Sequence, residues 1–260
     1  MIKTFPYPGK KTKLLKHIFP LIPEHKTYIE PFAGGLAVLC AKDKSKFEII
    51  NDLDRDITNF YKFVRLHKDA LLKDLENYFY NRQEFDELVN MHPNTDLQKA
   101  SRFYVTQCSS FGGEGKNWGR SANRHPGFDY NKANKNIDKL SDRLRSVYIE
   151  NKDFEDIINT YQNEEAFVYC DPPYLNGKSG KYKAFEKEDM IRLRDCLEKS
   201  KAKWLLSCDG SEDCKEIFKH NSTKEIDIIY GLANKSGKKS KELLVMSDSV
   251  SKNVSELILK

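Results

Sequence analysis

Four consecutive residues, Asp171, Pro172, Pro173 and Tyr174, follow an apolar run at residues 166–170 that is typical of a buried strand. The Asp171 carboxylate and the Pro172 carbonyl can each accept one amino hydrogen, and the Tyr174 ring can stack on a flat ring. An amino group on an aromatic base is a poor nucleophile, and two acceptors draw its nitrogen toward a reactive form. The tetrapeptide therefore suits a planar base with an exocyclic amine, with an ordinary Asp/Pro turn as the alternative.

The composition limits the class of protein. With 260 residues, 39% of them hydrophobic and 32% charged, the chain is long enough for one large α/β domain or for a domain with an insertion. The net charge of +5 permits a polyanionic partner, but it fits a solvated basic face equally well. The six cysteines form no Cys-x-x-Cys pair, so we expect no metal site and no disulfide framework. No signal peptide or transmembrane span is evident, which favours the cytoplasm.

Strand and helix patterns alternate along much of the chain. Strands are expected at residues 28–29, 47–50, 147–149, 166–170 and 204–207, and a hairpin at 226–230 and 243–246. Helices are expected at residues 12–18, 36–41, 57–66, 70–79 and 188–199. The pattern predicts an α/β fold with a mostly parallel sheet and a C-terminal antiparallel hairpin. Residues 1–57 and 146–260 would form the catalytic domain, and residues 58–145 an inserted helical subdomain.

The segment from Glu30 to Gly35 has the pattern of a strand that turns into a loop at two adjacent glycines. Such a turn lets a ligand approach the backbone closely. It lacks the spacing of a phosphate-binding loop, so a nucleoside without phosphates is the favoured ligand. Asp52 ends the next strand, where an acid commonly binds ribose hydroxyls, but its position also suits a helix N-cap.

The N-terminal segment around Tyr7, Gly9 and Lys11 precedes a short helical pattern. Lys11 could bind a ligand carboxylate and Gly9 could allow a close backbone approach, with a basic helix start as the alternative. A ribose, a base and an amino-acid tail together describe S-adenosylmethionine, which also carries the methyl group that an amine would attack.

With these segments assembled, nearly the whole chain resembles the Dam-like DNA adenine methyltransferases of bacteria and phages. The order of the motifs agrees as well, and the segment at residues 151–154 is similar to the family segment that reads the cofactor's adenine. The resemblance implies a Rossmann-like methyltransferase fold, S-adenosylmethionine as cofactor and adenine in double-stranded DNA as substrate. It implies that the catalytic residues are Asp171, Pro172 and Tyr174. It implies cofactor binding by Tyr7, Gly9, Lys11, Glu30, Phe32, Gly34, Gly35, Asp52, Asp153, Phe154 and Asp171.

The chain departs from the familiar family pattern in two places. Pro8 and Lys10 stand where other members often have small or amide residues, and the insertion lacks the familiar target-reading segment. Basic residues and aromatics nevertheless alternate there, as in segments that bind phosphates and fill the gap left by a flipped base. A solvated basic loop packed by aromatics is the competing interpretation. The residues expected to bind DNA are Lys10, Ser110, Phe111, Lys116, Asn117, Trp118, Arg120, Arg124, Lys238 and Lys239.

Other functions remain open at this point. A cytosine amino-methyltransferase more often has Ser in place of Asp171, and an RNA or protein amide methyltransferase more often has Asn. A DNA-binding protein on an inactive methyltransferase scaffold is the non-enzymatic alternative, which the intact Glu30, Asp52 and Asp171 oppose. We expect a monomer or weak dimer in a bacterial or phage-infected cell. The sequence does not indicate the recognition site or whether a cognate restriction endonuclease exists.

Overall fold

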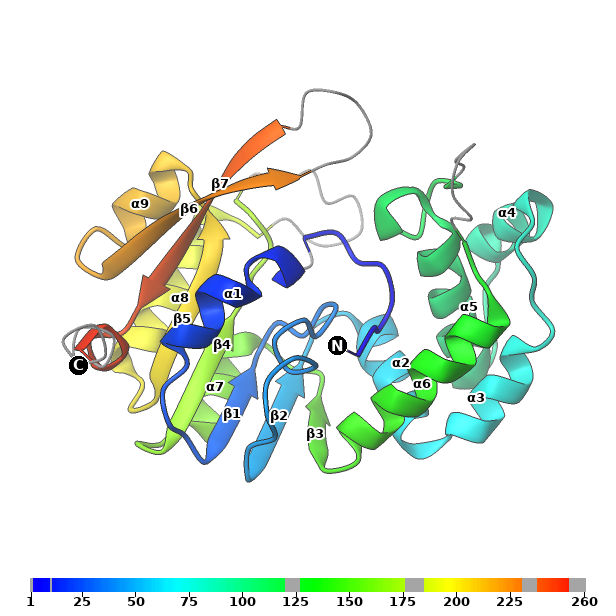
Figure 1. The fold of residues 1–260 in the computed structure, drawn as a ribbon, viewed down its shortest axis with the longest axis horizontal. Coiled ribbons are helices and arrows are strands. Elements are labelled where there is room, and N and C mark those ends of the chain that lie inside the picture. Colours follow the sequence, from blue (N-terminus) through cyan, green and yellow to red (C-terminus); the bar gives the residue numbers. More distant parts are fainter. Residues whose placement is uncertain (1, 10, 120–126, 176–184, 231–237, 253–260) are drawn as a thin grey trace. The chain divides into compact units, whose positions relative to one another are not determined.

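In the part of the chain that the structure describes, seven strands form one mixed sheet in the order β3-β2-β1-β4-β5-β7-β6 (Figure 1). The structure is a computed structural model that describes residues 2–9, 11–119, 127–175, 185–230 and 238–252. The strands are β1 Thr27–Glu30, β2 Phe47–Asn51, β3 Val147–Glu150, β4 Ala166–Cys170, β5 Lys203–Asp209, β6 Ser222–Tyr230 and β7 Lys238–Met246. β1 pairs in parallel with β2 and β4, and β4 pairs in parallel with β5. β7 runs antiparallel to both β5 and β6, so the predicted hairpin and the predicted fold class are confirmed.

The described chain divides into two compact units. The first consists of Met1–Thr12, Gly34–Asp43 and Asp54–Asn151, and the second of Lys13–Ala33, Lys44–Leu53 and Lys152–Lys260. The predicted insertion at residues 58–145 falls within the first unit, which also contains two shorter segments from outside that range. Each unit is described separately below.

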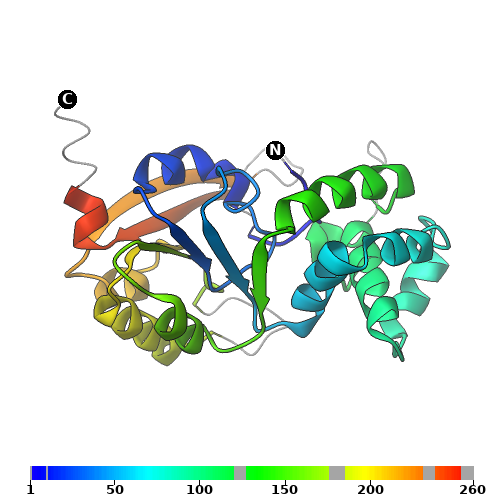
Figure 2. The ribbon, with the colours of Figure 1, turned by 90° about the horizontal axis from the view of Figure 1, so that it is seen from below.

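In the second unit, helices cover the sheet because its central strands are apolar on both faces. All five residues of β4 are buried, as expected for a parallel strand with both faces covered. α7 Phe154–Tyr161 and α8 Lys187–Lys199 lie on one face, and the short α1 Leu15–Ile18 lies on the other (Figures 1 and 2). Met190, Leu193 and Leu197 of α8 are fully buried against the sheet, as their spacing predicted.

The helices of the first unit pack around an aromatic core. They are α2 Arg55–Leu66, α3 Lys68–Leu75, α4 Arg82–Asn90, α5 Asp96–Ser109 and α6 Tyr130–Leu144. Phe60 of α2 stacks on Tyr104 of α5 with ring centroids 5.2 Å apart, and Phe5 packs edge-on against Phe60 and Phe103. Buried residues recur every three or four positions along α2, because only one stripe of this helix faces the core.

Two of the expected helices differ in the structure. Residues 36–41 form consecutive turns rather than an α-helix, because Leu36 has a left-handed backbone (φ 49°) and Ala41 bonds three residues back, to the Val38 carbonyl. Residues 36–40 are all buried rather than amphipathic, so the apolar character of the run indicated burial and not a helix. The expected helix at residues 12–18 is a 3₁₀ turn at Lys11–Lys13 followed by α1.

Candidate active site

Three acids of the second unit stand at the same edge of the sheet. Glu30 ends β1, Asp52 follows β2 and Asp171 follows β4, and these strands are neighbours with parallel directions. The carboxyl ends of parallel strands are where ligands bind in open α/β sheets. Glu30 is 2% exposed and accepts a 2.8 Å hydrogen bond from the Tyr28 hydroxyl. Asp52 does not cap a helix: the N-cap of α2 is Asp54, whose carboxylate accepts the Asp56 N–H.

Asp171 is hydrogen-bonded to a neighbouring strand. The Ser207 hydroxyl of β5 lies 3.2 Å from Asp171 Oδ1 and donates to it, and it also lies 2.9 Å from the Tyr169 hydroxyl. Ser207 and Tyr169 are both buried. Burial, with Asp171 nearby, raises the pKa of the Tyr169 hydroxyl well above its usual value. Tyr169 therefore stays protonated and can act as a hydrogen-bond donor.

Tyr174 is held by an acid from the hairpin. Its hydroxyl donates a short hydrogen bond to Oε1 of Glu242, which is fully buried in β7. Glu242 lies opposite Asp209 in the register of β7 with β5. The ring of Tyr174 is half-buried, so the contact with Glu242 fixes its phenol end and leaves part of its surface accessible.

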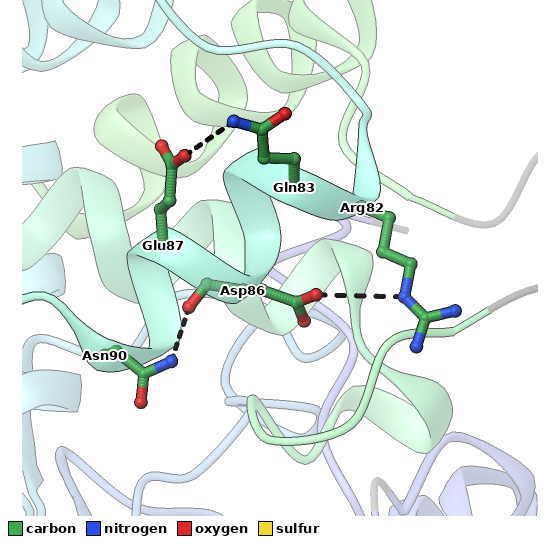
Figure 3. A pocket seen from close by; sticks show the side chains of 5 residues that line it. All are labelled: Arg82, Gln83, Asp86, Glu87 and Asn90. Atoms are coloured by element: carbon green, nitrogen blue, oxygen red, sulfur yellow. Dashed lines mark hydrogen bonds and ion pairs between the residues drawn. The ribbon is translucent and has the colours of Figure 1, made fainter.

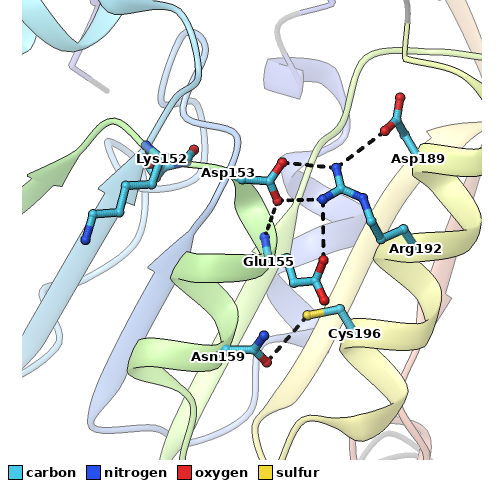
Figure 4. Close-up of polar contacts among 8 residues, drawn as sticks. Lys152, Asp153, Glu155, Asn159, Asp189, Arg192 and Cys196 are labelled. Carbon is cyan, nitrogen blue, oxygen red and sulfur yellow. Dashed lines mark hydrogen bonds and ion pairs between the residues drawn. The ribbon is translucent and has the colours of Figure 1, made fainter.

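An arginine of α8 supports the segment that leads into α7 (Figure 4). Arg192 Nη1 and Nη2 donate to the two carboxylate oxygens of Asp153 at 2.9 and 3.0 Å, a bidentate pair. Asp153 also caps α7 by accepting the Glu155 N–H at 2.9 Å. The guanidinium lies 4.3 Å from the centre of the Phe154 ring, and Phe154 packs against Phe32 with centroids 5.5 Å apart. Arg192 thus holds both the acid and the aromatic ring of this segment.

Asn51 joins two loops at the same sheet edge. Its side-chain amide nitrogen donates to the carbonyls of Pro31 and Lys152 at 2.9 and 3.0 Å, and its oxygen accepts the Lys152 N–H at 2.8 Å. Asn51 is 1% exposed, so these bonds are shielded from water. The side chain therefore fixes the loop after β1 relative to the residues that lead into α7.

The remaining candidate cofactor residues lie in the first unit. Gly34 has φ 42°, and a Cβ there would stand 2.9 Å from the Tyr7 ring, so a larger residue does not fit. The carbonyls of Gly34 and Gly35 accept hydrogen bonds from Tyr61 and Thr4 at 2.6 and 2.8 Å. Lys11 is buried, and its ammonium donates to the Gly9 carbonyl at 3.3 Å.

The segment after α5 forms a narrow hairpin-like loop. Phe111 N–H donates to the Asn117 carbonyl at 2.7 Å, and Gly119 N–H donates to the Ser109 carbonyl at 2.9 Å. This loop exposes Phe111, Lys116 and Asn117, with Phe111 55% exposed.

Two of the residues expected to bind DNA support this loop from within. Trp118 stacks on Tyr80 with centroids 4.3 Å apart and meets Phe85 edge-on. The Ser110 hydroxyl is buried, accepts the Gly115 N–H and donates to the Gln107 carbonyl. Lys10, Arg120 and Arg124 lie outside the described residues, and so do the side chains of Lys238 and Lys239, which begin β7.

A surface hollow on α4 carries side chains that already pair with one another. It is lined by one helix face, where Gln83 donates to Glu87 and Arg82 pairs with Asp86 (Figure 3). These are ordinary contacts of a solvated helix. The described part of the chain contains no cluster of three or more His, Cys, Asp or Glu residues that could hold a metal ion. None of its helices is both long and apolar enough to cross a membrane.

Comparison with known proteins decides the family. The sequence model of the D12 class of N6 adenine-specific DNA methyltransferases matches residues 7–232. The chain belongs to this family. The type II methyltransferase M.MjaIII of Methanocaldococcus jannaschii is 30% identical, covering 92% of this chain and 96% of its own. M1.LlaDCHI of Lactococcus lactis subsp. cremoris is 28% identical over 84% of this chain and 85% of its own. M.CviBI of Paramecium bursaria Chlorella virus NC1A is 26% identical over 81% and 84%.

Membership of the D12 class confirms the resemblance found in the motifs and the adenine-specific DNA methyltransferase activity expected from it. Sequence reasoning missed four side chains of this D12 enzyme that bond to the candidate site residues or to the loops beside them. They are Asn51, Arg192, Ser207 and Glu242. Asn51 had a signal in the sequence, because an amide at the end of a predicted buried strand needs hydrogen-bond partners and can find them in neighbouring loops. The other three act across the sheet or between helices, and no local pattern marks them.

Proposed function

We propose that this D12 methyltransferase transfers the methyl group of S-adenosylmethionine to the exocyclic amino group of adenine in double-stranded DNA. The observation that carries the proposal is the set of Glu30, Asp52 and Asp171 at one edge of the parallel sheet. Tyr174 follows Asp171 directly and adds a partly accessible ring. This combination of acids and an aromatic ring fits a nucleoside cofactor and a base with an amino group.

The residues of the second unit fit S-adenosylmethionine. Asp52 would bind the ribose hydroxyls, and Phe32 and Phe154 would provide apolar ring surface for the cofactor's adenine. Both carboxylate oxygens of Asp153 already bind Arg192, so Asp153 would act by orienting this segment as well as by contact. When bound, S-adenosylmethionine supplies a methyl group on a positively charged sulfur. The assignment of Tyr7, Gly9, Lys11, Gly34 and Gly35 to the same ligand rests on their sequence motifs and on the resemblance that these motifs carry.

The catalytic work of this chain is positioning. The Asp171 carboxylate and the Pro172 carbonyl would each accept one hydrogen of the target amine, which directs the nitrogen lone pair toward the methyl group. The Tyr174 ring would stack on the base. The target adenine must leave the duplex, because its amino group is out of reach inside the stack.

The exposed loop of the first unit is the proposed DNA contact. Phe111, Lys116 and Asn117 are exposed and suit an apolar wedge, a phosphate contact and a base-edge contact. Trp118 and Ser110 would support this loop from within. Lys10, Arg120, Arg124, Lys238 and Lys239 remain predicted phosphate contacts.

The other finer assignments stay predictions. They are the division into a catalytic domain at residues 1–57 and 146–260 and a target-recognition subdomain at 58–145, action as a monomer or weak dimer, and action in the cytoplasm of a bacterial or phage-infected cell.

Labelled methyl transfer tests the proposal. The purified protein, incubated with methyl-labelled S-adenosylmethionine and double-stranded DNA, is expected to label N6 of adenine, and methylation-sensitive sequencing of DNA from expressing cells should identify the flanking sequence. The same assay with RNA, and with duplexes whose adenines are already methylated, provides the controls. Methyl label on cytosine would contradict the proposal. So would label on RNA with none on any DNA duplex of a broad panel of sequences.

Arg192→Met is expected to raise the KM for S-adenosylmethionine about tenfold and to change kcat little, because Asp153 and Phe154 lose the side chain that orients them. The charged groups involved are partly exposed, so we expect only a small change in the melting temperature. Arg194→Met is the matched control, because Arg194 lies on the same helix and pairs with Asp195 instead. An unchanged KM in Arg192→Met would contradict the orienting role.

A further inference from the structure

Two hydrogen bonds link three side chains in a row: the Tyr169 hydroxyl in the core of the sheet, the Ser207 hydroxyl and the Asp171 carboxylate. The Tyr169 hydroxyl lies 2.9 Å from Ser207 Oγ, and Ser207 Oγ lies 3.2 Å from Asp171 Oδ1. Tyr169 is 1% exposed and Ser207 is fully buried, so neither exchanges these partners with bulk water. Ser207 also lies 3.5 Å from the Cys170 carbonyl, a longer contact.

The numbers of donors and acceptors on Tyr169, Ser207 and Asp171 fix the direction of both hydrogen bonds. An ionised carboxylate only accepts hydrogen bonds, so the Ser207 hydroxyl donates its one hydrogen to Asp171. Tyr169 must then donate to the Ser207 oxygen, which it can do because its hydroxyl stays protonated. Consecutive hydrogen bonds that point in the same direction polarise one another, so the bond from Ser207 to Asp171 is strengthened.

We propose that Ser207, supported by Tyr169, is a positioning residue that fixes the plane of the Asp171 carboxylate and keeps it ionised for binding the target amine. The inference rests on the proposed function, in which Asp171 accepts an amino hydrogen. A donor held on Oδ1 stabilises the charged form of the acid. Asp171 then serves as a hydrogen-bond acceptor of fixed orientation throughout the reaction.

Several titratable groups surround Asp171, so a donor that stabilises its ionised form has an effect to oppose. Glu30 at the end of β1 and Glu242 in β7 are buried acids near Tyr169, and Asp209 follows Ser207 by two residues in β5. The Cys170 thiol is buried next to Asp171, with the Cys196 thiol of α8 close by. Neighbouring negative charges favour protonation of an acid, whereas the Ser207 donor opposes it.

The test measures the single-turnover rate of methyl transfer to duplex DNA as a function of pH, in the full-length chain. Ser207→Ala is expected to lower the rate at neutral pH about tenfold and to move the acidic limb of the profile up by roughly one pH unit. The shift is upward because an acid that loses its donor binds a proton more readily, and transfer needs the ionised form. Ser207→Cys keeps the volume but has a weak donor, and should behave like Ser207→Ala.

Tyr169→Phe keeps the ring in the core and should lower the rate about threefold, with a smaller upward shift. The Tyr169→Phe variant also keeps the inference testable should Ser207→Ala fail to fold. In the Ser207→Ala/Tyr169→Phe double variant the transfer rate should fall no further than in Ser207→Ala, since Tyr169 acts through Ser207. Tyr104→Phe, which removes a buried hydroxyl from α5, is the matched control and should leave the profile unmoved.

The outcomes separate the two levels of the proposal. Unmoved pH profiles in the Ser207 and Tyr169 variants of an active enzyme, or fully additive losses in the double variant, would overturn the positioning role alone. A wild-type protein that transfers no methyl group to DNA adenine would overturn the proposed function and this inference with it.

Discussion

Asp171→Ala is expected to lower the rate of methyl transfer by about a thousandfold or more and to leave duplex binding within about twofold of wild type. The variant loses one of the two acceptors proposed to orient the target amine, whereas the proposed DNA contacts lie in other segments. Single-turnover transfer of labelled methyl groups measures the first quantity, and a gel-shift titration at fixed salt measures the second.

Asp171→Asn separates charge from shape at this position. The amide keeps one acceptor oxygen but places an N–H₂ group near an amine that needs acceptors, so we expect a rate between those of wild type and alanine. Asp213→Ala is the control, because Asp213 is an exposed acid of the same unit that pairs with Lys187 at the surface. Substantial activity in Asp171→Ala would show that the Pro172 carbonyl alone suffices and that Asp171 is misassigned.

The strands of this protein could be predicted because each carries a local signal. The runs at residues 166–170 and 204–207 are apolar and short, and the structure has β4 Ala166–Cys170 and β5 Lys203–Asp209 there. The carboxyl ends of β1, β2 and β4 were also predictable to within one residue. Since parallel strands end at one edge, the positions of Glu30, Asp52 and Asp171 along the chain sufficed to expect them at the same edge.

The errors came from positions where packing overrides local preference. The run at residues 36–41 is apolar enough for a helix, but Leu36 has a left-handed backbone and Ala41 N–H bonds to the Val38 carbonyl, so the run forms turns instead. The N-cap alternative for Asp52 fails in the structure, because Asp54, two residues later, has the extended backbone and the side-chain bond of the α2 N-cap. Sequence spacing alone does not separate such neighbours.

The supporting side chains could not be predicted because they depend on contacts between distant segments. Tyr174 meets Glu242 across 68 residues of sequence, and Asp153 meets Arg192 across 39. Each contact requires the pairing of β5 with β7 or the packing of α8 beside α7, which no single segment specifies. Trp118 stacks on Tyr80, a packing contact of the kind that the competing interpretation of the basic loop allowed, but its partner Tyr80 lies too far along the chain to be predicted.

Tyr174→Ala is expected to reduce methyl transfer about a hundredfold, the second largest effect, because the flipped base loses its stacking surface. Tyr174→Phe keeps the ring and should retain most of the rate. It should nevertheless lower the free energy of unfolding by about 1–3 kcal/mol, since the fully buried Glu242 loses the hydroxyl that donates to it. Transfer rates and urea unfolding curves measure the two effects separately.

Combining Tyr174→Phe with Glu242→Leu tests whether the stability loss arises because the buried Glu242 carboxylate loses its donor. The double variant removes both polar partners, so much of the lost stability should return, because replacing both members of a buried hydrogen bond is milder than removing one. Its rate should match that of Tyr174→Phe, since the phenylalanine ring is held only by packing in both variants. Tyr148→Ala, at an exposed tyrosine of β3, is the control. If Tyr174→Phe proved as slow as Tyr174→Ala, the hydroxyl and its bond to Glu242 would carry the effect, and stacking would not.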